Sequence, residues 1–223
     1  MHQQISKKII IYLFIFLILG TFNNKNISKL YSKDNYDFNI VDQSEFNEDN
    51  IIKDLAKLKN QNLFLLEKNK VLKTVDSHKI VENFFVFKNY PSSLNIKIER
   101  TKFLAIVKKN GSNFYIGANG NLIQIDNKKT DLPFIFGDID ISEFLELKSI
   151  IDNSKFNYND IKNLFYFKSK RWDIETKNGL LIKLPRKNLD NSFELLLNII
   201  NKKDMQNINN IDLRQNNQVI LNG

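Results

Sequence analysis

Apolar and polar residues alternate over two neighbouring stretches in the first half of the chain. In "LNIKIER", Leu94, Ile96 and Ile98 alternate with polar residues, which is typical of a β-strand with one buried face. The preceding stretch, "IVENFFVFKN", is rich in strand-forming residues, and the "YPSS" between the two contains a turn-favouring proline. The pattern therefore predicts two strands joined by a turn, followed by further β-rich sequence.

A strand and two helices are predicted ahead of this pair. The strand covers "YDFNIVD", and the first helix covers residues 48–60, with acidic residues in its first turn. A shorter helix covers residues 67–75. The apolar residues expected on the inward faces of the two helices are Ile51, Leu55 and Leu58, then Val71, Leu72 and Val75. The order is β-α-α-β-β, and it occupies residues 36–101.

Asn-Gly pairs dominate the second half of the chain. They occur in "KKNGSNFY", "GANGNLIQ" and "ETKNGLLIKL", and Asn-Gly between apolar alternations is a strong hairpin signal. Asp140 and Glu143 have the spacing of a capping box ahead of a helix, and "NSFELLLNIIN" predicts another. Residues 102–223 are therefore predicted to be β-rich with flanking helices, and the whole chain is predicted to be α+β.

The N-terminus carries an unbroken apolar run, "IIIYLFIFLILGTF", after Lys7 and Lys8. As a helix it would rise about 21 Å at ~1.5 Å per residue, somewhat short of a ~30 Å hydrocarbon core. We expect a transmembrane anchor over 9–24, a cytoplasmic tip over 1–8 and a tether over 25–35. A cleaved signal peptide is the open alternative, and under either interpretation the body is exported.

Composition narrows the function classes. The chain has no cysteine, which excludes disulfides and thiolate metal sites. Its net charge is +8, but the lysines are scattered rather than clustered with aromatic residues, so no nucleic-acid partner is predicted.

Few residues are arranged for catalysis. His78 is expected to be a packing or surface residue, and Asp138 and Asp140 fit a turn and a helix cap better than a metal site. No base is placed to activate Ser92 or Ser93. We therefore expect no enzyme activity, no metal or other cofactor and no small-molecule substrate. Trp172 is expected to be a core or rim aromatic.

A short strand, "QVIL", is predicted near the end of the chain, with Val219 and Leu221 on one side and Gln218 and Ile220 on the other. At a sheet edge this strand could pair with a strand of another protein. The sequence leaves open whether it is an edge strand or an inner strand.

Several motifs, in order along nearly the whole chain, resemble the FtsQ/DivIB family of bacterial cell division proteins. After the apolar N-terminal segment come "VFKNYPSSLNIKIER", "ANGNLIQID" and "DLPFIFGD", and then "RWDIETKNGLLIKLP" and "IDLRQNN". Each motif is weak alone, but the ordered series is fairly specific. Two departures are Gln215, where the family often has Tyr, and Lys102 near the family's usual Pro.

The resemblance implies a POTRA domain over 36–101 and the family's β domain over 102–223. It implies a non-enzymatic scaffold of the divisome in the inner membrane, with a cytoplasmic N-terminus and a periplasmic body. FtsB-like and FtsL-like proteins would be partners, and other septal proteins would dock on the POTRA unit. By matching position, the residues implied to contact the FtsB-like partner are Arg214, Gln215, Gln218, Val219, Ile220 and Leu221.

Two other classes of protein are alternatives to this interpretation. Another POTRA-containing periplasmic export or outer-membrane assembly factor would have repeated POTRA units or a membrane barrel. An exported enzyme would need a cluster of titratable groups in a cleft.

Overall fold

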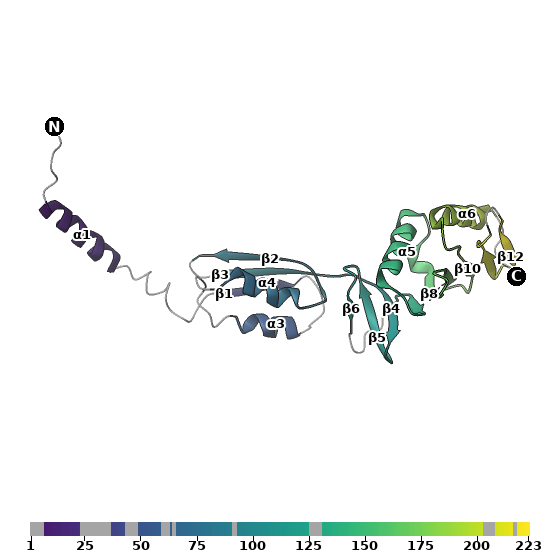
Figure 1. The fold of residues 1–223 in the computed structure, drawn as a ribbon, viewed down its shortest axis with the longest axis horizontal. Coiled ribbons are helices and arrows are strands. Elements are labelled where there is room, and N and C mark those ends of the chain that lie inside the picture. Colours follow the sequence, from purple (N-terminus) through teal and green to yellow (C-terminus); the bar gives the residue numbers. More distant parts are fainter. Residues whose placement is uncertain are drawn as a thin grey trace, which may run out of the picture. The chain divides into compact units, whose positions relative to one another are not determined.

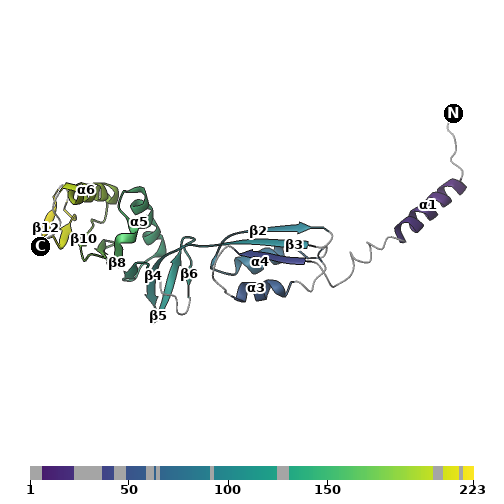
Figure 2. The ribbon, with the colours of Figure 1, turned by 180° about the vertical axis from the view of Figure 1, so that it is seen from behind.

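A computed structural model of the chain describes residues 7–22, 37–42, 49–58, 63, 66–90, 93–124, 131–202, 208–215 and 218–223. The chain divides into two compact units, unit 1 (Met1–Arg100) and unit 2 (Thr101–Gly223). The architecture is mixed α+β, with a small sheet in unit 1 and a large sheet in unit 2 (Figures 1 and 2).

The helix α1 spans Lys7–Phe22. Its 16 residues rise about 24 Å at ~1.5 Å per residue, against a hydrocarbon core of ~30 Å. Among the described residues, none of the helices combines the length and apolar character required to cross a bilayer. The transmembrane helix expected over 9–24 is therefore not found, and α1 ends at Phe22. Residues 23–24, the tether expected over 25–35 and most of the expected tip lie outside the described residues.

Unit 1 continues with a strand, two helices and two strands. They are β1 (Asp37–Asp42), α3 (Asp49–Ala56), α4 (Lys68–Asp76), β2 (Val81–Asn89) and β3 (Ser93–Arg100). The strands form one sheet in the order β1-β3-β2, in which β3 is parallel to β1 and antiparallel to β2 (Figure 1).

The buried side of this sheet is formed by the alternation seen in the sequence. Leu94, Ile96 and Ile98 are at most 1% exposed. The helices contribute the buried residues Ile51 and Leu55 from α3 and Val71 and Val75 from α4. Leu72, expected to face inward with them, is only partly buried. The inward face of each helix was thus largely readable from the spacing of its apolar residues.

Unit 2 is built on one nine-stranded sheet in the order β12-β11-β10-β9-β8-β7-β4-β5-β6. The strands before its first helix are β4 (Phe103–Lys109), β5 (Ser112–Gly117), β6 (Leu122–Ile123) and β7 (Phe134–Phe136). The helix α5 (Ile141–Asn153) and the 3-10 turn η1 (Tyr158–Asp160) follow. The remaining elements are β8 (Ile161–Tyr166), β9 (Trp172–Thr176), β10 (Leu181–Lys183), α6 (Leu189–Lys202), β11 (Asn210–Asp212) and β12 (Ile220–Asn222).

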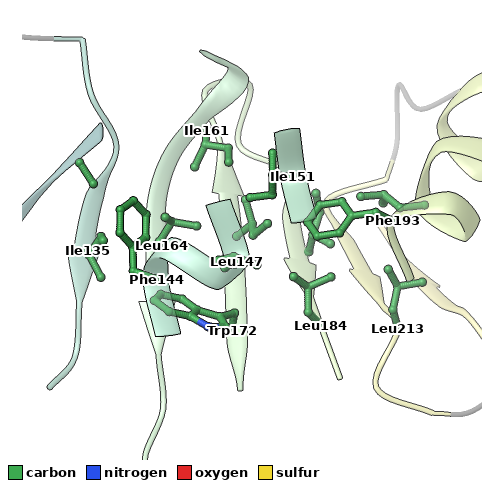
Figure 3. Packing of buried hydrophobic residues seen from close by; sticks show 14 of the residues in the cluster. Ile135, Phe144, Leu147, Ile151, Ile161, Leu164, Trp172, Leu184, Phe193 and Leu213 are labelled. Atoms are coloured by element: carbon green, nitrogen blue, oxygen red, sulfur yellow. The ribbon is translucent and has the colours of Figure 1, made fainter. Parts of the chain in front are cut away.

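Residues that pair across neighbouring strands build the core of unit 2. One row of paired residues crosses the sheet from β7 to β11, and each member is at most 1% exposed: Ile135, Leu164, Ile174, Ile182 and Ile211. Phe144, Leu147 and Ile151 of α5 and Phe193 of α6 belong to the same cluster, as Figure 3 shows. Trp172 is a core residue, 3% exposed, whose ring lies 4.7 Å from that of Tyr166.

The three Asn-Gly pairs all lie in hairpins, but only one forms the expected two-residue turn. Asn110 (φ 51°) and Gly111 (φ 84°) connect Lys109 to its partner Ser112, as a type I′ turn requires. In the other two hairpins only the glycine, Gly120 or Gly179, has positive φ, and the connections are longer.

The expected capping box at α5 is only half formed. The carboxylate of Asp140 accepts a hydrogen bond from the backbone N–H of Ser142 at 3.1 Å. Glu143 does not return to the cap, because its carboxylate pairs with Lys170 at 2.7 Å.

Candidate partner-binding site at the carboxy-terminal strand

The last strand, β12, lies at one end of the nine-stranded sheet. It pairs antiparallel with β11, matching Ile220 with Asp212, Leu221 with Ile211 and Asn222 with Asn210. Of the two arrangements that the sequence left open, the structure shows the edge, with one flank unpaired by any described strand. The strand begins two residues later than expected and extends to Asn222.

Side chains alternate across β12 as expected. Val219 and Leu221 are partly buried against the hydrophobic core of unit 2, whereas Ile220 is 47% exposed on the opposite face. Gln218 is exposed. The side chains of Val219 and Leu221 therefore fix the strand to its own sheet, and only Ile220 offers apolar surface outward.

Arg214 is held beside this edge by Asp212. The Asp212 carboxylate, 9% exposed, accepts hydrogen bonds from the Arg214 backbone N–H at 3.0 Å and from its Nε at 2.8 Å, and it also contacts Nη2. These hydrogen bonds lower the pKa of Asp212, and the carboxylate in turn raises the pKa of Arg214. The Arg214 side chain is 40% exposed, so a cation held by Asp212 lies next to β12.

A second arginine, Arg171, which was not predicted as a site residue, occupies a matching position directly before β9. Arg171 Nε donates to the buried Asp173 at 3.3 Å, and its guanidinium lies 4.4 Å from the ring centroid of Phe167. Burial raises the pKa of Asp173, an effect that Arg171 opposes. Within the described residues this Nε hydrogen bond is the only one made by the Arg171 side chain, which leaves most of its five N–H donors available.

The strand register brings the two arginines to one end of the same face. Lys183 of β10 pairs with both Asp173 and Asp212, so the two carboxylates lie one strand to either side of it. Because β10 is antiparallel to β9 and parallel to β11, Arg171 before Asp173 and Arg214 after Asp212 point to the same end. Strands two apart are separated by about 10 Å. The sequence contains Arg-x-Asp at residues 171–173 and Asp-x-Arg at residues 212–214. These two motifs could have identified the arginine pair only if the order of the strands had been known.

Gln215 is exposed directly after Arg214, and residues 216–217 lie outside the described residues. The six residues singled out from the sequence thus divide into three groups. Arg214 and Ile220 present charge and apolar surface, Gln215 and Gln218 are exposed polar residues, and Val219 and Leu221 face the core.

Two of the residues considered for chemistry, His78 and Asp140, have structural contacts, while Ser92 lies outside the described residues. His78 Nε2 lies 3.2 Å from the Asp54 carboxylate and so connects the end of α4 to α3, while Asp140 caps α5. In the part of the chain that the structure describes, no three His, Asp or Glu residues are grouped to hold a metal ion. The arrangement at β12 is suited to pairing with another strand and to contacting carboxylates.

Comparison with known proteins agrees with the sequence motifs. Residues 105–214 match the family model described as "Cell division protein FtsQ/DivIB, C-terminal". The Cell division protein FtsQ of Rickettsia bellii (strain RML369-C) is 25% identical over 185 residues, covering 80% of this chain and 68% of that protein. That of Rhizobium radiobacter is 25% identical over 139 residues, covering 60% and 66%.

A solved structure of the major extracytoplasmic domain of the trans isomer of DivIB from Geobacillus stearothermophilus is also similar. It is 12% identical, covers 48% of this chain and 99% of that chain, and has a TM-score of 0.34. The family model and the relatives together confirm the resemblance seen in the motifs: this chain belongs to the FtsQ/DivIB family of cell division proteins.

Proposed function

We propose that this cell division protein is a non-enzymatic scaffold of the divisome that binds an FtsB-like partner by strand addition to β12. The observation that carries the proposal is the place of β12 at the end of the sheet, paired on one flank by β11. Its other flank offers backbone N–H and C=O groups to an incoming strand.

The energetics of such a contact are modest for the backbone alone. A strand added to a three-residue edge makes two or three hydrogen bonds, each contributing about 1 kcal/mol net. Side chains must supply the rest. Ile220 provides apolar contact, and Arg171 and Arg214 are placed to bind carboxylates of the partner, because each is already oriented by a buried aspartate.

The proposal assigns a docking role to unit 1. We propose that residues 36–101 form a POTRA domain and residues 102–223 the family's β domain. The strand-helix-helix-strand-strand order and the sheet order β1-β3-β2 support the first assignment. Other septal proteins would dock on the POTRA domain, while an FtsL-like protein would join the complex through the FtsB-like partner.

The proposal also places the chain at the bacterial inner membrane, with its body on the periplasmic side. Its support is α1, whose apolar side chains from Ile9 to Leu19 are 40–78% exposed around the whole helix. An isolated helix that is apolar on every side is stable against lipid rather than against water. Flotation of the full chain with inner-membrane vesicles, and protease protection of its body in spheroplast-derived vesicles, test this part.

Cysteine cross-linking tests the strand contact directly, because the chain has no cysteine of its own. Single variants Ile220→Cys and Asn222→Cys would be expressed with an FtsB-like partner carrying cysteines along its candidate strand. We expect cross-links at partner positions two residues apart, the period of a paired strand. Asn113→Cys, an exposed position on β5, is the control and should give none. Cross-links with no period, or equal yield at position 113, would contradict strand addition.

A proline at the edge provides a second test. Ile220→Pro removes the N–H through which β12 pairs with Asp212 of β11, so it should detach the edge strand and abolish capture of the FtsB-like partner, whereas Ile220→Val should retain it. Circular dichroism should be unchanged in both variants. Undiminished capture by the proline variant would move the contact elsewhere.

A further inference from the structure

The uncovered face of the sheet in unit 1 carries large apolar side chains. Phe85 and Phe87 of β2 are 46% and 55% exposed, and Tyr90, directly after the strand, is 57% exposed. Phe85 and Phe87 lie on the face opposite to the one that Leu94, Ile96 and Ile98 bury against α3 and α4. We call Phe85, Phe87 and Tyr90 the aromatic tip.

The strand register places the aromatic tip at one end of the sheet. Asn89, the last residue of β2, pairs with Ser93, and Ser93 also pairs with Asp37, the first residue of β1. The turn between β2 and β3 therefore lies beside the start of β1. The aromatic tip is at the end of the unit where the chain enters from α1.

Polarity changes along β2 on this face. Phe87 is paired with Asn95, and Phe85 with Lys97, whose Nζ lies 5.7 Å from the Phe85 ring centroid and 2.9 Å from the Glu99 carboxylate. Further from the turn, the same face continues with Asn83, which pairs with Glu99. The surface is thus aromatic at the entry end and polar at the other.

The connection to α1 is short. Residues 23–36 separate Phe22 from β1, and a fully extended chain of this length reaches at most about 50 Å at ~3.5 Å per residue. If α1 is held in lipid, as proposed above, this connection keeps the entry end of unit 1 at a high local concentration near the membrane surface.

From these observations we infer that the aromatic tip contacts the interfacial region of the lipid bilayer, an inference that rests on the proposed membrane attachment through α1. Aromatic side chains with an apolar ring, and Tyr with its polar hydroxyl, are suited to the headgroup level. Lys97 lies one row behind Phe87, where its cation can meet lipid phosphates.

The direction of the polarity change favours lipid over a protein strand. A strand added to the free edge of β2 would pair along all of its length, and its contacts would not need the apolar residues to be gathered at one end. An end-on contact with a membrane needs this gathering, because only the end of the domain reaches the apolar phase.

Site-specific fluorescence tests the inference in the full chain. Single variants Phe87→Cys and Tyr90→Cys would be labelled with an environment-sensitive dye and reconstituted in vesicles of phosphatidylethanolamine and phosphatidylglycerol. The matched control is Asn83→Cys, which is exposed on the same face of the same strand, four residues from Phe87. We expect lipids carrying a doxyl quencher to quench the label at 87 and 90 at least threefold more than the label at 83.

Equal quenching at the three positions would overturn the inference. So would protection of the Phe87→Cys thiol from a water-soluble maleimide in cells without lipid quenching in vesicles, because the tip would then contact a protein. A Phe85→Ser/Phe87→Ser variant labelled at Tyr90→Cys adds a measurement that does not depend on the dye replacing Phe87. Its quenching should fall to the level of the control, and retained quenching would contradict a role of the two rings.

The same experiment separates this inference from the proposed function. Failure of the full chain to float with the vesicles would reject attachment through α1. Flotation without selective quenching would reject the aromatic tip alone, and neither result would affect strand addition at β12.

Discussion

In unit 1, the face of the sheet away from the helices exposes Phe85 and Phe87, whereas in unit 2 the corresponding face is occupied by the chain's own charged groups. Asp173 and Asp212 are buried on that face by the arginines they bind, and Phe136 stacks on Phe165 at 5.1 Å. The two uncovered sheet faces therefore differ in the side chains that form them. In unit 2 the carboxylates on this face are paired within the chain and Phe136, 45% exposed, stacks on Phe165, while in unit 1 Phe87 is 55% exposed near one end of the sheet.

Truncating a buried and an exposed phenylalanine should separate the two faces most clearly. Phe144→Ala in α5 removes a fully buried ring and should destabilise unit 2 by about 3–5 kcal/mol, whereas Phe87→Ala should change unit 1 by less than about 0.5 kcal/mol. Urea unfolding followed by fluorescence of Trp172, the single tryptophan, reports unit 2. Hydrogen exchange of peptides from β3 reports unit 1. A large loss of protection in β3 on Phe87→Ala would show that the exposed ring is structural.

A glycine at the end of β7 should give the next largest effect. Gly137 has φ +112°, and a Cβ there would lie 2.2 Å from the carbonyl oxygen of Tyr166. We expect Gly137→Ala to cost about 2–3 kcal/mol in unit 2, because both the backbone and the contact between β7 and β8 are strained. Gly111→Ala is the control, since its φ is +84° but no atom lies within 4 Å, and it should cost about 1 kcal/mol. Equal losses would mean that the close approach of β7 and β8 is unimportant.

The paired charges of unit 2 should give a smaller effect that depends on pH. Hydrogen bonds from Arg214 lower the pKa of Asp212 below 3.8, so its contribution is full above that value and is lost as pH falls through the folded-state pKa. Asp212→Asn should therefore cost about 1–2 kcal/mol at pH 7 and less near pH 3. Urea midpoints measured by Trp172 fluorescence between pH 7 and pH 3 check this.

Asp173 should show the opposite dependence of stability on pH. Burial raises its pKa, so this carboxyl contributes less to stability as pH rises through the raised value. The penalty of Asp173→Asn relative to the native chain should therefore grow as pH falls. The same pH trend for both variants would show that the two Arg–Asp pairs are not distinguished by burial.

The fold was most predictable where the cause lies within a few residues. The spacing of Leu94, Ile96 and Ile98 identified the buried side of β3, and the Asn110–Gly111 pair identified the turn between β4 and β5. The first and last residues of β12 were harder to predict. Alternation in "QVIL" indicates which side chains face the core but not which residues pair with β11.

The remaining features depend on residues far apart in the chain. Glu143 pairs with Lys170 instead of capping its own helix, which no local spacing could indicate. Arg171 is part of the candidate site because β10 lies between β9 and β11. This order of strands places Arg171 on the same side of the sheet as Arg214. The parallel place of β7 between β4 and β8 likewise follows from tertiary packing rather than from the sequence of "PFIF".

The single large sheet has a mechanical consequence. The first strand of unit 2, β4, and its last strand, β12, belong to the same sheet, with β11, β10, β9, β8 and β7 between them. Tension between a partner held on β12 and the start of unit 2 would cross these strands sideways, one hydrogen-bonded ladder after another. The ladder joining β4 to β7 has only two residue pairs, fewer than any other ladder on this path, so it would be among the first to open and would limit the load that the sheet can transmit.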